Sequence, residues 1–541
     1  MAEEIRKTVE KMCNSISALL ATAPLFIFFS SFAQLTARVL HPMPSITGVL
    51  KRILIKLIIG FPQQSMWLLM RSIHSENNNR KNFFKELLNR AMIDDSTGNL
   101  RKFIPDILKF AKLMTEMCQK NFDPKVKGLS LRRDFSDLHK LFSRSTNFSQ
   151  ILLPFGLLVN VTLPKSFYEK DYNPFPSKPI FIRSIDDCID LMHSLQRPKK
   201  IKINGTDGKT YTILCKPGDD LRKDFCLIEF CNLLNRCFKR DPEARRRQLK
   251  VKTYLVISLS DTCGLIEWIP GLLPFRSLVE EQYQLIMDYS SIRESIHKKF
   301  PPYNQNVKHR VKHFENEVLP KLKPPVFGNW FLSTYTDPLS WFSARQAYTR
   351  SSAVFSIVGY LLGLGDRHGE NILIEEVTGE TVHVDLNCMF NKGEEFQVPE
   401  RVPFRLTHNM VHGMGITEYE GTFRKACEHT LRVARDNKEA LLNFVRPFRY
   451  DHLIEWIKNN SQSRSGSFES PLDQVFHWFE TFPQIILIID LFQRLKKWSS
   501  ISRPDLKASL RETRENCRKV CLYQSKDRSI TSLKRRRMST I

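Results

Sequence analysis

Asp366 and Asn371 are the polar pair whose types and spacing most clearly suggest chemistry. They lie five residues apart in a loop between an apolar stretch at 354–364 and a short apolar run at 372–374. In phosphoryl transfer, an Asp in such a loop accepts or orients the attacking hydroxyl, and an Asn oxygen holds Mg²⁺ near the phosphates. The alternative interpretation is a polar turn whose glycines merely end a helix.

Asp385 supports the phosphoryl-transfer interpretation. It ends the apolar run 382–384, which follows a Thr-Gly turn after the run at 372–374. If the two runs pair as strands, the Asp385 carboxylate faces the same metal ion as Asn371. Apolar strands seldom end on an unpaired acid for packing reasons alone. The sequence therefore predicts a site for a divalent cation and a phosphorylated ligand.

Lys216 is the candidate for contact with nucleotide phosphates. It ends an alternating run at 209–215, where kinases carry such a lysine on a strand of the small lobe. A strand-end lysine can also be simply solvated. No glycine-rich phosphate loop occurs, and the nearest substitute is the segment that contains Ser194. The acidic residues that could fix the Lys216 ammonium group are Asp219, Asp220 and Asp224.

The elements that must position these residues form a small β-rich region and a larger helical one. Runs 200–204 and 209–215 alternate around a Gly-Thr-Asp-Gly turn, which predicts a β-hairpin. The elements expected after it are a helix at 219–238, a strand at 252–259, and helices over 278–446 around a strand pair at 372–385. This order is typical of a two-lobed kinase.

The N-terminal part of the chain is predicted to be an array of helices. Apolar residues recur at three- and four-residue spacing up to about residue 142, and prolines then crowd the segment 151–182. The apolar stretch 17–35 is interrupted by Pro24 and Gln34. A membrane span needs about 20 largely uninterrupted apolar residues, so we expect a buried helix here.

Charge and cysteine usage limit the environment of the protein. The formal net charge of +25 favours nucleic acid, anionic lipid or acidic protein partners, or a place in an assembly whose acidic counterpart lies on another chain. The twelve cysteines form no CxxC pair. Scattered cysteines suit a reducing compartment, cytosol or nucleus, and do not suggest a zinc site.

Residues 363–373, Gly-Leu-Gly-Asp-Arg-His-Gly-Glu-Asn-Ile-Leu, resemble the catalytic loop of the phosphatidylinositol-3-kinase-related kinases, in which Asp-Arg-His replaces His-Arg-Asp. Residues 216–224 resemble the lysine strand and following helix of this family, and 402–410 resemble the end of its activation segment. Residues 61–67 resemble the close of its helical FAT region. The resemblance extends from about residue 25 to residue 456.

The resemblance implies a role for each matching residue. Asp366 would be the catalytic aspartate, with His368 stabilising charge on the phosphate, and Asn371 and Asp385 would bind Mg²⁺ or Mn²⁺. The implied nucleotide-binding residues are Lys216, Asp219, Asp224, Ser194, and the hinge Glu267-Trp268-Ile269, whose backbone would read adenine. Trp268 can equally be an ordinary core tryptophan. Leu386-Asn387 departs from the common Phe-Gly, which puts flipping of the activation loop in doubt.

The expected fold class is α+β. The expected domains are a FAT-like helical region (1–150), a Pro-rich connection (151–182), a small lobe (183–270), a large lobe (271–456) and a Ser-rich, basic tail (457–541) without a recognisable FATC segment. Its terminal basic cluster is a candidate nuclear-localisation signal or, alternatively, a solvated and disordered tail.

The function implied is an ATP-dependent protein kinase that phosphorylates Ser/Thr-Gln sites in DNA-damage and replication-stress signalling in the nucleus. A regulatory partner protein is expected, with indirect DNA contact and no membrane span. The alternatives are a phosphoinositide lipid kinase and a pseudokinase scaffold.

Overall fold

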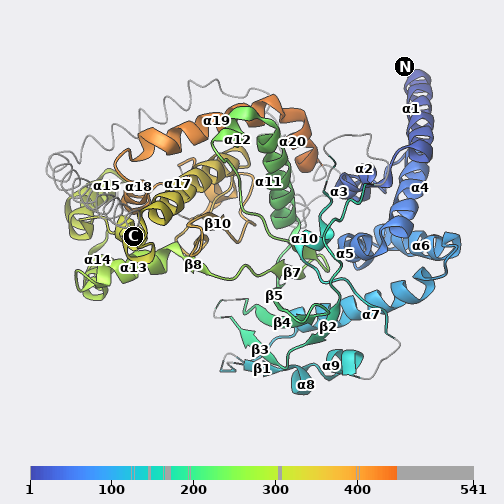
Figure 1. Cartoon of the computed structure of the whole chain (residues 1–541), viewed down its shortest axis with the longest axis horizontal. Coiled ribbons are helices and arrows are strands. Elements are labelled where there is room, and N and C mark those ends of the chain that lie inside the picture. The colour runs from blue at the N-terminus through green and yellow to red at the C-terminus, as the bar shows by residue number, and fades with distance from the viewer. Residues whose placement is uncertain are drawn as a thin grey trace, which may run out of the picture.

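The computed structural model describes residues 2–446, except 124, 127, 144–147, 163, 165–171, 193, 195, 302–306, 398 and 401. The tail predicted at 457–541, with its basic cluster, lies outside the described residues, as does the end of the predicted large lobe. Figure 1 shows three parts: N-terminal helices (blue) on one side, a twisted sheet below, and a mainly helical lobe (yellow to orange) on the other side.

The N-terminal part is helical, as the apolar spacing predicts. Its helices are α1 (Ala2–Thr22), α2 (Leu25–Phe29), α3 (Phe32–Ala37), α4 (Pro44–Gly60), α5 (Pro62–Ile73), α6 (Asn78–Asp94) and α7 (Leu100–Gln119). The stretch 17–35, expected to be one buried helix, is divided among α1, α2 and α3. Pro24 cannot donate the hydrogen bond that would continue α1, and a turn at Ser30 and Ser31 separates α2 from α3. Within the described residues, no helix is both long and apolar enough to cross a membrane.

The small lobe is built on an antiparallel sheet with strand order β1-β3-β4-β5-β7-β6, and β2 pairs with β4. The predicted hairpin is β4 and β5, in which Lys200 lies opposite Leu214. The strands are β1 (Gly128–Ser130), β2 (Ile182–Ile185), β3 (Cys188–Leu191), β4 (Lys199–Gly205), β5 (Thr210–Pro217), β6 (Val256–Ser258) and β7 (Cys263–Glu267). The sequence did not predict β1, which lies in the range expected to be helical.

Short helices join these strands, and one long helix leads toward the large lobe. The short helices are α8 (Leu131–Asp134), α9 (Ser136–Ser143), α10 (Gly156–Val159) and α12 (Pro242–Arg246). The long helix is α11 (Arg222–Arg240), the helix predicted at 219–238, and it rises from the sheet toward α19 and α20 (Figure 1).

The large lobe surrounds a three-stranded antiparallel sheet, in the order β10-β9-β8. Its strands are β8 (Leu272–Pro274), β9 (Ile372–Glu375) and β10 (Thr381–His383). Its α-helices are α13 (Phe275–Gln284), α14 (Tyr289–Lys299), α15 (Val307–His313), α16 (Phe327–Thr334), α17 (Pro338–Leu361), α18 (His408–Met414), α19 (Arg424–Asp436) and α20 (Lys438–Val445). Shorter π and 3₁₀ turns are η1 (Phe314–Val318), η2 (Leu319–Leu322), η3 (Lys392–Glu395) and η4 (Tyr419–Phe423).

The buried side chains form two clusters that do not follow the sequence order of the lobes. One cluster joins the N-terminal helices to the small-lobe sheet, so that Trp67 and Phe110 share a core with Ile213 and Leu265. The other joins α11 to the large lobe, where Phe230 shares a core with α17 and β9. The sheet that carries Lys216 is therefore packed against the N-terminal helices.

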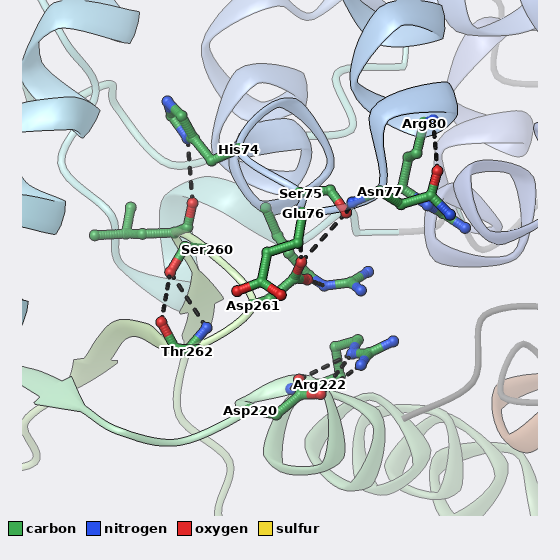
Figure 2. A network of polar contacts seen from close by, with 12 residues as sticks. His74, Ser75, Glu76, Asn77, Arg80, Asp220, Arg222, Ser260, Asp261 and Thr262 are labelled. Carbon is green, nitrogen blue, oxygen red and sulfur yellow. Dashed lines mark hydrogen bonds and ion pairs between the residues drawn. The ribbon is translucent and has the colours of Figure 1, made fainter. Parts of the chain in front are cut away.

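A polar network ties the α5–α6 corner to the turn between β6 and β7 (Figure 2). Asp261 in this turn is buried, pairs with Arg71 at 2.7 Å and accepts hydrogen bonds from the Glu76 backbone amide at 2.9 Å and the Ser75 hydroxyl at 3.3 Å. The next residue, Thr262, accepts a hydrogen bond from the Asp219 amide at 3.0 Å. The N-terminal helices thus contact the turn that supports the segment after Lys216.

Candidate active site

The loop predicted to be catalytic connects α17 to β9. Asp366 and His368 both reach solvent, with 38% and 42% of their side chains exposed, and the His368 Nε2 atom lies 3.9 Å from the Asp366 carboxylate. The Asp366 backbone amide donates to the Glu400 carboxylate at 2.9 Å. Asp366 has a φ of +57°, a left-handed conformation that non-glycine residues seldom adopt outside constrained sites.

Asn371 and Asp385 are brought together by the pairing of β9 and β10. Asn371 is buried just before β9, and its Nδ2 group donates to the Asp366 carbonyl at 2.9 Å, so its Oδ1 atom is oriented as an acceptor. The Val384 amide donates to the Asn371 carbonyl at 3.1 Å, which places Asp385 next to the catalytic loop. Asp385 also has a left-handed φ of +55°.

Lys216 faces this group from the small lobe. Its Nζ atom lies 2.7 Å from Asp219 and 3.0 Å from Asp385, and only 11% of its side chain is exposed. Burial lowers the pKa of Lys216, but the carboxylates of Asp224, Asp219 and Asp385 more than offset this and raise its pKa above the usual lysine value. The ammonium group is therefore charged at neutral pH.

Asp224 is the innermost carboxylate of the site. It is fully buried on α11, and its Oδ1 atom accepts the Leu386 amide at 3.0 Å. Burial raises the pKa of Asp224 to about 6, although the Lys216 ammonium lowers it. Its Oδ2 atom is buried and has no hydrogen-bond partner among the described residues.

The oxygen donors of this group fit a magnesium or manganese ion. Mg²⁺ is usually bound by one or two carboxylates together with substrate phosphates, and it prefers oxygen ligands. Asn371 offers an amide oxygen and Asp385 offers a carboxylate beside it.

The predicted hinge follows β7, but its side chains are engaged elsewhere. The Glu267 carboxylate accepts backbone amides of Leu255 at 2.9 Å and Gly156 at 3.1 Å, so it supports the chain instead of facing a nucleotide. The amide of Glu267 donates to the Leu255 carbonyl just before β6, and that of Trp268 donates to the Thr212 carbonyl in β5. Of the three hinge amides, only that of Ile269 has no partner among the described residues. The Trp268 ring lies 5.1 Å from the Lys200 ammonium.

Ser194 is exposed in the loop between β3 and β4. The Gln196 side chain in this loop contacts the Gly218 carbonyl at 3.5 Å, two residues after Lys216. Arg197 anchors the loop to carbonyls of Phe122 and Asp123, at 3.1 and 2.6 Å. The loop that contains Ser194 therefore lies beside the lysine strand, where a loop covering the phosphates is expected.

Arg367 and Glu400 support the site, and the sequence interpretation gave neither of them a role. Arg367 is buried and donates to the carbonyls of Gly365 and Val384, both at 2.9 Å, and to that of Asp385. It thus joins the catalytic loop to the metal-binding segment. In the sequence, only the position of Arg367 directly after Asp366 could have indicated this supporting role.

Glu400 explains two glycines of this site. A Cβ atom at Gly365 or at Gly393 would overlap the Glu400 carboxylate, so only glycine permits the close approach that lets Glu400 hold Asp366. No local pattern marks Glu400, because the contact joins residues 34 positions apart.

The chain is similar to family models and individual proteins that are described as kinases. The family described as phosphatidylinositol 3- and 4-kinase matches residues 210–458, and the family described as serine/threonine-protein kinase ATR-like, HEAT repeats, matches residues 11–108. The latter range overlaps the region predicted to resemble FAT.

Individual proteins give the same result. The chain is 38% identical to protein kinase rad3 of Schizosaccharomyces pombe over 470 residues, 86% of this chain and 19% of that protein. It is 36% identical to the serine/threonine-protein kinase ATR of Drosophila melanogaster, over 83% of this chain and 18% of that protein. The solved FAT and kinase domain of CtTel1 superposes with a TM-score of 0.73 at 25% identity, covering 89% of this chain and 33% of that chain. The chain spans about a fifth of the length of these curated relatives.

Proposed function

Because this chain belongs to the phosphatidylinositol-3-kinase-related kinases of the ATR type, we propose that it transfers the γ-phosphoryl group of ATP to serine and threonine hydroxyls of proteins. The observation that carries the proposal is the Lys216–Asp385 contact of 3.0 Å, which joins the small lobe to the hairpin that bears Asn371. The predicted α+β class, with a two-lobed kinase domain after a helical region, is confirmed.

We assign the reaction steps to residues by position. Asp366, exposed and fixed through its backbone by Glu400, orients the acceptor hydroxyl and takes its proton. His368, within 3.9 Å of that carboxylate, stabilises charge that develops on the phosphoryl group. Lys216 has three N–H donors, and its described contacts use two of them, so one can point to a phosphate.

Asn371 and Asp385 would hold the divalent cation, which when bound neutralises phosphate charge during transfer. The position of Asp385 is set from both sides, by Lys216 and by Arg367. Ser194 would cover the phosphates, and Ile269 offers a free amide for adenine. For Glu267 we retain only a supporting role for its side chain, because backbone amides occupy its carboxylate.

A protein substrate is favoured over a phosphoinositide. Between residues 388 and 408 the basic residues Lys392, Arg401 and Arg405 are balanced by three glutamates, so the segment is formally neutral. Of these glutamates, Glu394 and Glu395 are exposed on η3 and would repel lipid phosphates. An enzyme acting on an inositol phosphate needs clustered basic side chains at this place.

We also propose the biological setting from the relatives. By analogy with the ATR kinases, the substrates carry Gln after Ser or Thr, a regulatory partner of the ATR-interacting type binds the protein, and DNA contact is indirect. The setting is checkpoint signalling in the nucleus. The pseudokinase alternative is disfavoured because Lys216, Asp366, Asn371 and Asp385 are all present.

The test is a side-by-side assay of γ-phosphate transfer with Mg²⁺ and labelled ATP. The acceptors are a Ser-Gln peptide, a Ser-Ala peptide and phosphatidylinositol vesicles. We expect the fastest transfer to the Ser-Gln peptide. Faster transfer to lipid would refute the protein-kinase proposal, equal rates on the two peptides would remove the glutamine preference, and no transfer to any acceptor would favour the scaffold.

A further inference from the structure

Residues 385–387 are held at four points by β5, the turn after it and the start of α11. Lys216 contacts the Asp385 carboxylate at 3.0 Å, and the Asp224 carboxylate accepts the Leu386 amide at 3.0 Å. The Lys223 ammonium donates to the Asn387 carbonyl at 2.8 Å, and the Asn387 side-chain Nδ2 donates to Asp219 at 3.1 Å. The segment that carries Asp385, the proposed metal ligand, is thus attached residue by residue to β5, α11 and the turn between them.

Two of these four contacts use backbone groups, which any residue at 386 or 387 would supply. The contact to Asp219 is different, because it requires an amide side chain at position 387. The glycine that many kinases have there would lose this contact and would add backbone freedom. Asn387 therefore provides a link that a glycine cannot.

Asp219 connects this link to the catalytic lysine. The same oxygen, Oδ2, lies 2.7 Å from the Lys216 ammonium and 3.1 Å from Asn387 Nδ2, and only 13% of the Asp219 side chain is exposed. Charge-assisted hydrogen bonds of this kind are stronger than those between neutral groups. One carboxylate thereby fixes both Lys216 and the segment after Asp385.

The chemistry of the amide suits this place. A neutral donor satisfies Asp219 without bringing a positive charge that would compete with the cation for Asp385. A carboxylate at 387 would face Asp219 at about the distance of the present hydrogen bond, and like charges in such a site repel strongly. A lysine or arginine would oppose metal binding by its charge.

We propose that Asn387 is a positioning residue, which holds Asp385 in its metal-binding orientation by bonding to Asp219 in the turn after β5. This inference rests on the proposed function, in which Asp385 binds the cation. Asn387 acts through Asp219 and Lys216. Its loss should therefore weaken metal binding and slow transfer without abolishing either.

The test compares wild-type protein with Asn387→Ala, Asn387→Gly and Asp219→Ala, and with the Asn387→Ala/Asp219→Ala pair. The control is Asn443→Ala, at an exposed position of α20. Mn²⁺ binding is measured by electron paramagnetic resonance with a non-hydrolysable ATP analogue, which requires no turnover. We expect Asn387→Ala and Asn387→Gly to weaken Mn²⁺ binding about tenfold, equivalent to about 1.4 kcal/mol. Asn443→Ala should bind Mn²⁺ as wild type does.

Transfer to the Ser-Gln peptide is then measured against Mg²⁺ concentration. For both Asn387 variants we expect a higher Mg²⁺ requirement and about tenfold lower kcat, with unchanged KM for peptide. The double variant should be no weaker than Asp219→Ala, because both changes remove one contact. Wild-type Mn²⁺ binding by the Asn387 variants, or additive losses in the double variant, would overturn the inference. If wild type binds Mn²⁺ normally but transfers no phosphate, the proposed function fails and the Mn²⁺ comparison still decides the role of Asn387.

Discussion

Lys216→Met removes the ammonium group that interacts with the carboxylates of Asp219, Asp224 and Asp385. Asp224 is fully buried and Asp219 nearly so, whereas 39% of the Asp385 side chain is exposed and is screened by water. Removing one partner of a buried ion pair typically destabilises a protein by about 3–5 kcal/mol. Part of this loss is relieved by protonation of Asp224, so we expect a loss of about 3 kcal/mol at pH 8.

The pH dependence of this loss has a definite sign. The pKa of Asp224, already about 6 in the presence of Lys216, should rise further when the ammonium that lowers it is removed. A carboxyl group with a raised folded-state pKa holds a proton that the unfolded chain releases, so its destabilising effect grows as pH rises toward that pKa. Lys216→Met should therefore be destabilised less at pH 6 than at pH 8.

The assay is denaturant unfolding of wild type, Lys216→Met and Lys216→Met/Asp224→Asn at both pH values, with kinase activity in parallel. Asp224→Asn should recover part of the lost stability, but none of these lysine variants should regain activity. Lys298→Met, whose side chain is 72% exposed, serves as the matched control and should unfold like wild type. Equal unfolding midpoints for Lys216→Met and wild type at both pH values, or a further loss on adding Asp224→Asn, would refute the electrostatic reasoning.

Three further predictions concern single side chains. Asp385→Ala should abolish Mg²⁺-dependent transfer while circular dichroism shows an intact fold, and activity within about tenfold of wild type, roughly 1.4 kcal/mol of barrier, would contradict its metal role. Asp366→Asn keeps the shape of the side chain, so calorimetry should find ATP binding preserved while turnover collapses; a parallel loss of both would assign Asp366 to structure or metal binding. Burial lowers the pKa of His412, whose Nδ1 atom accepts the Gly328 amide at 3.0 Å. Below about pH 6.5 the histidine of the unfolded chain gains a proton before the folded one does. The free energy of unfolding should therefore be highest above about pH 6.5 and should fall below it. His412→Asn retains an acceptor and should flatten stability between pH 6.5 and 5, and an unchanged slope in denaturation curves would exclude this histidine.

The elements with a strong local pattern were predictable from the sequence. The β4–β5 hairpin follows from two alternating runs around a glycine turn, and β9 and β10 follow from apolar runs around a second turn. These two hairpins place Lys216, Asn371 and Asp385, and the structure brings the three residues together. Their catalytic roles remain predictions.

The features that were missed depend on contacts distant in sequence. β1 has only three residues and pairs with β3 nearly sixty positions later. It is too short for a periodic pattern of apolar residues to predict it. The Glu267 carboxylate accepts hydrogen bonds from the backbone amides at 156 and 255, and no sequence motif predicts these contacts. Likewise, Asn387 gains its partner only when the two lobes meet.

The shared core of the N-terminal helices and the small-lobe sheet has a mechanical consequence. If a flexible joint separated these helices from the sheet, a force on the helices would rotate them as a separate body. Strand β5, which carries Lys216, would then stay undisturbed. Here Trp67 and Phe110 are buried in the same cluster as Ile213, three residues before Lys216, and the Trp67 indole donates to the Leu152 carbonyl at 2.9 Å. The helices and the strand that carries Lys216 are therefore packed as one unit, so a displacement of the helices would be passed directly to Lys216.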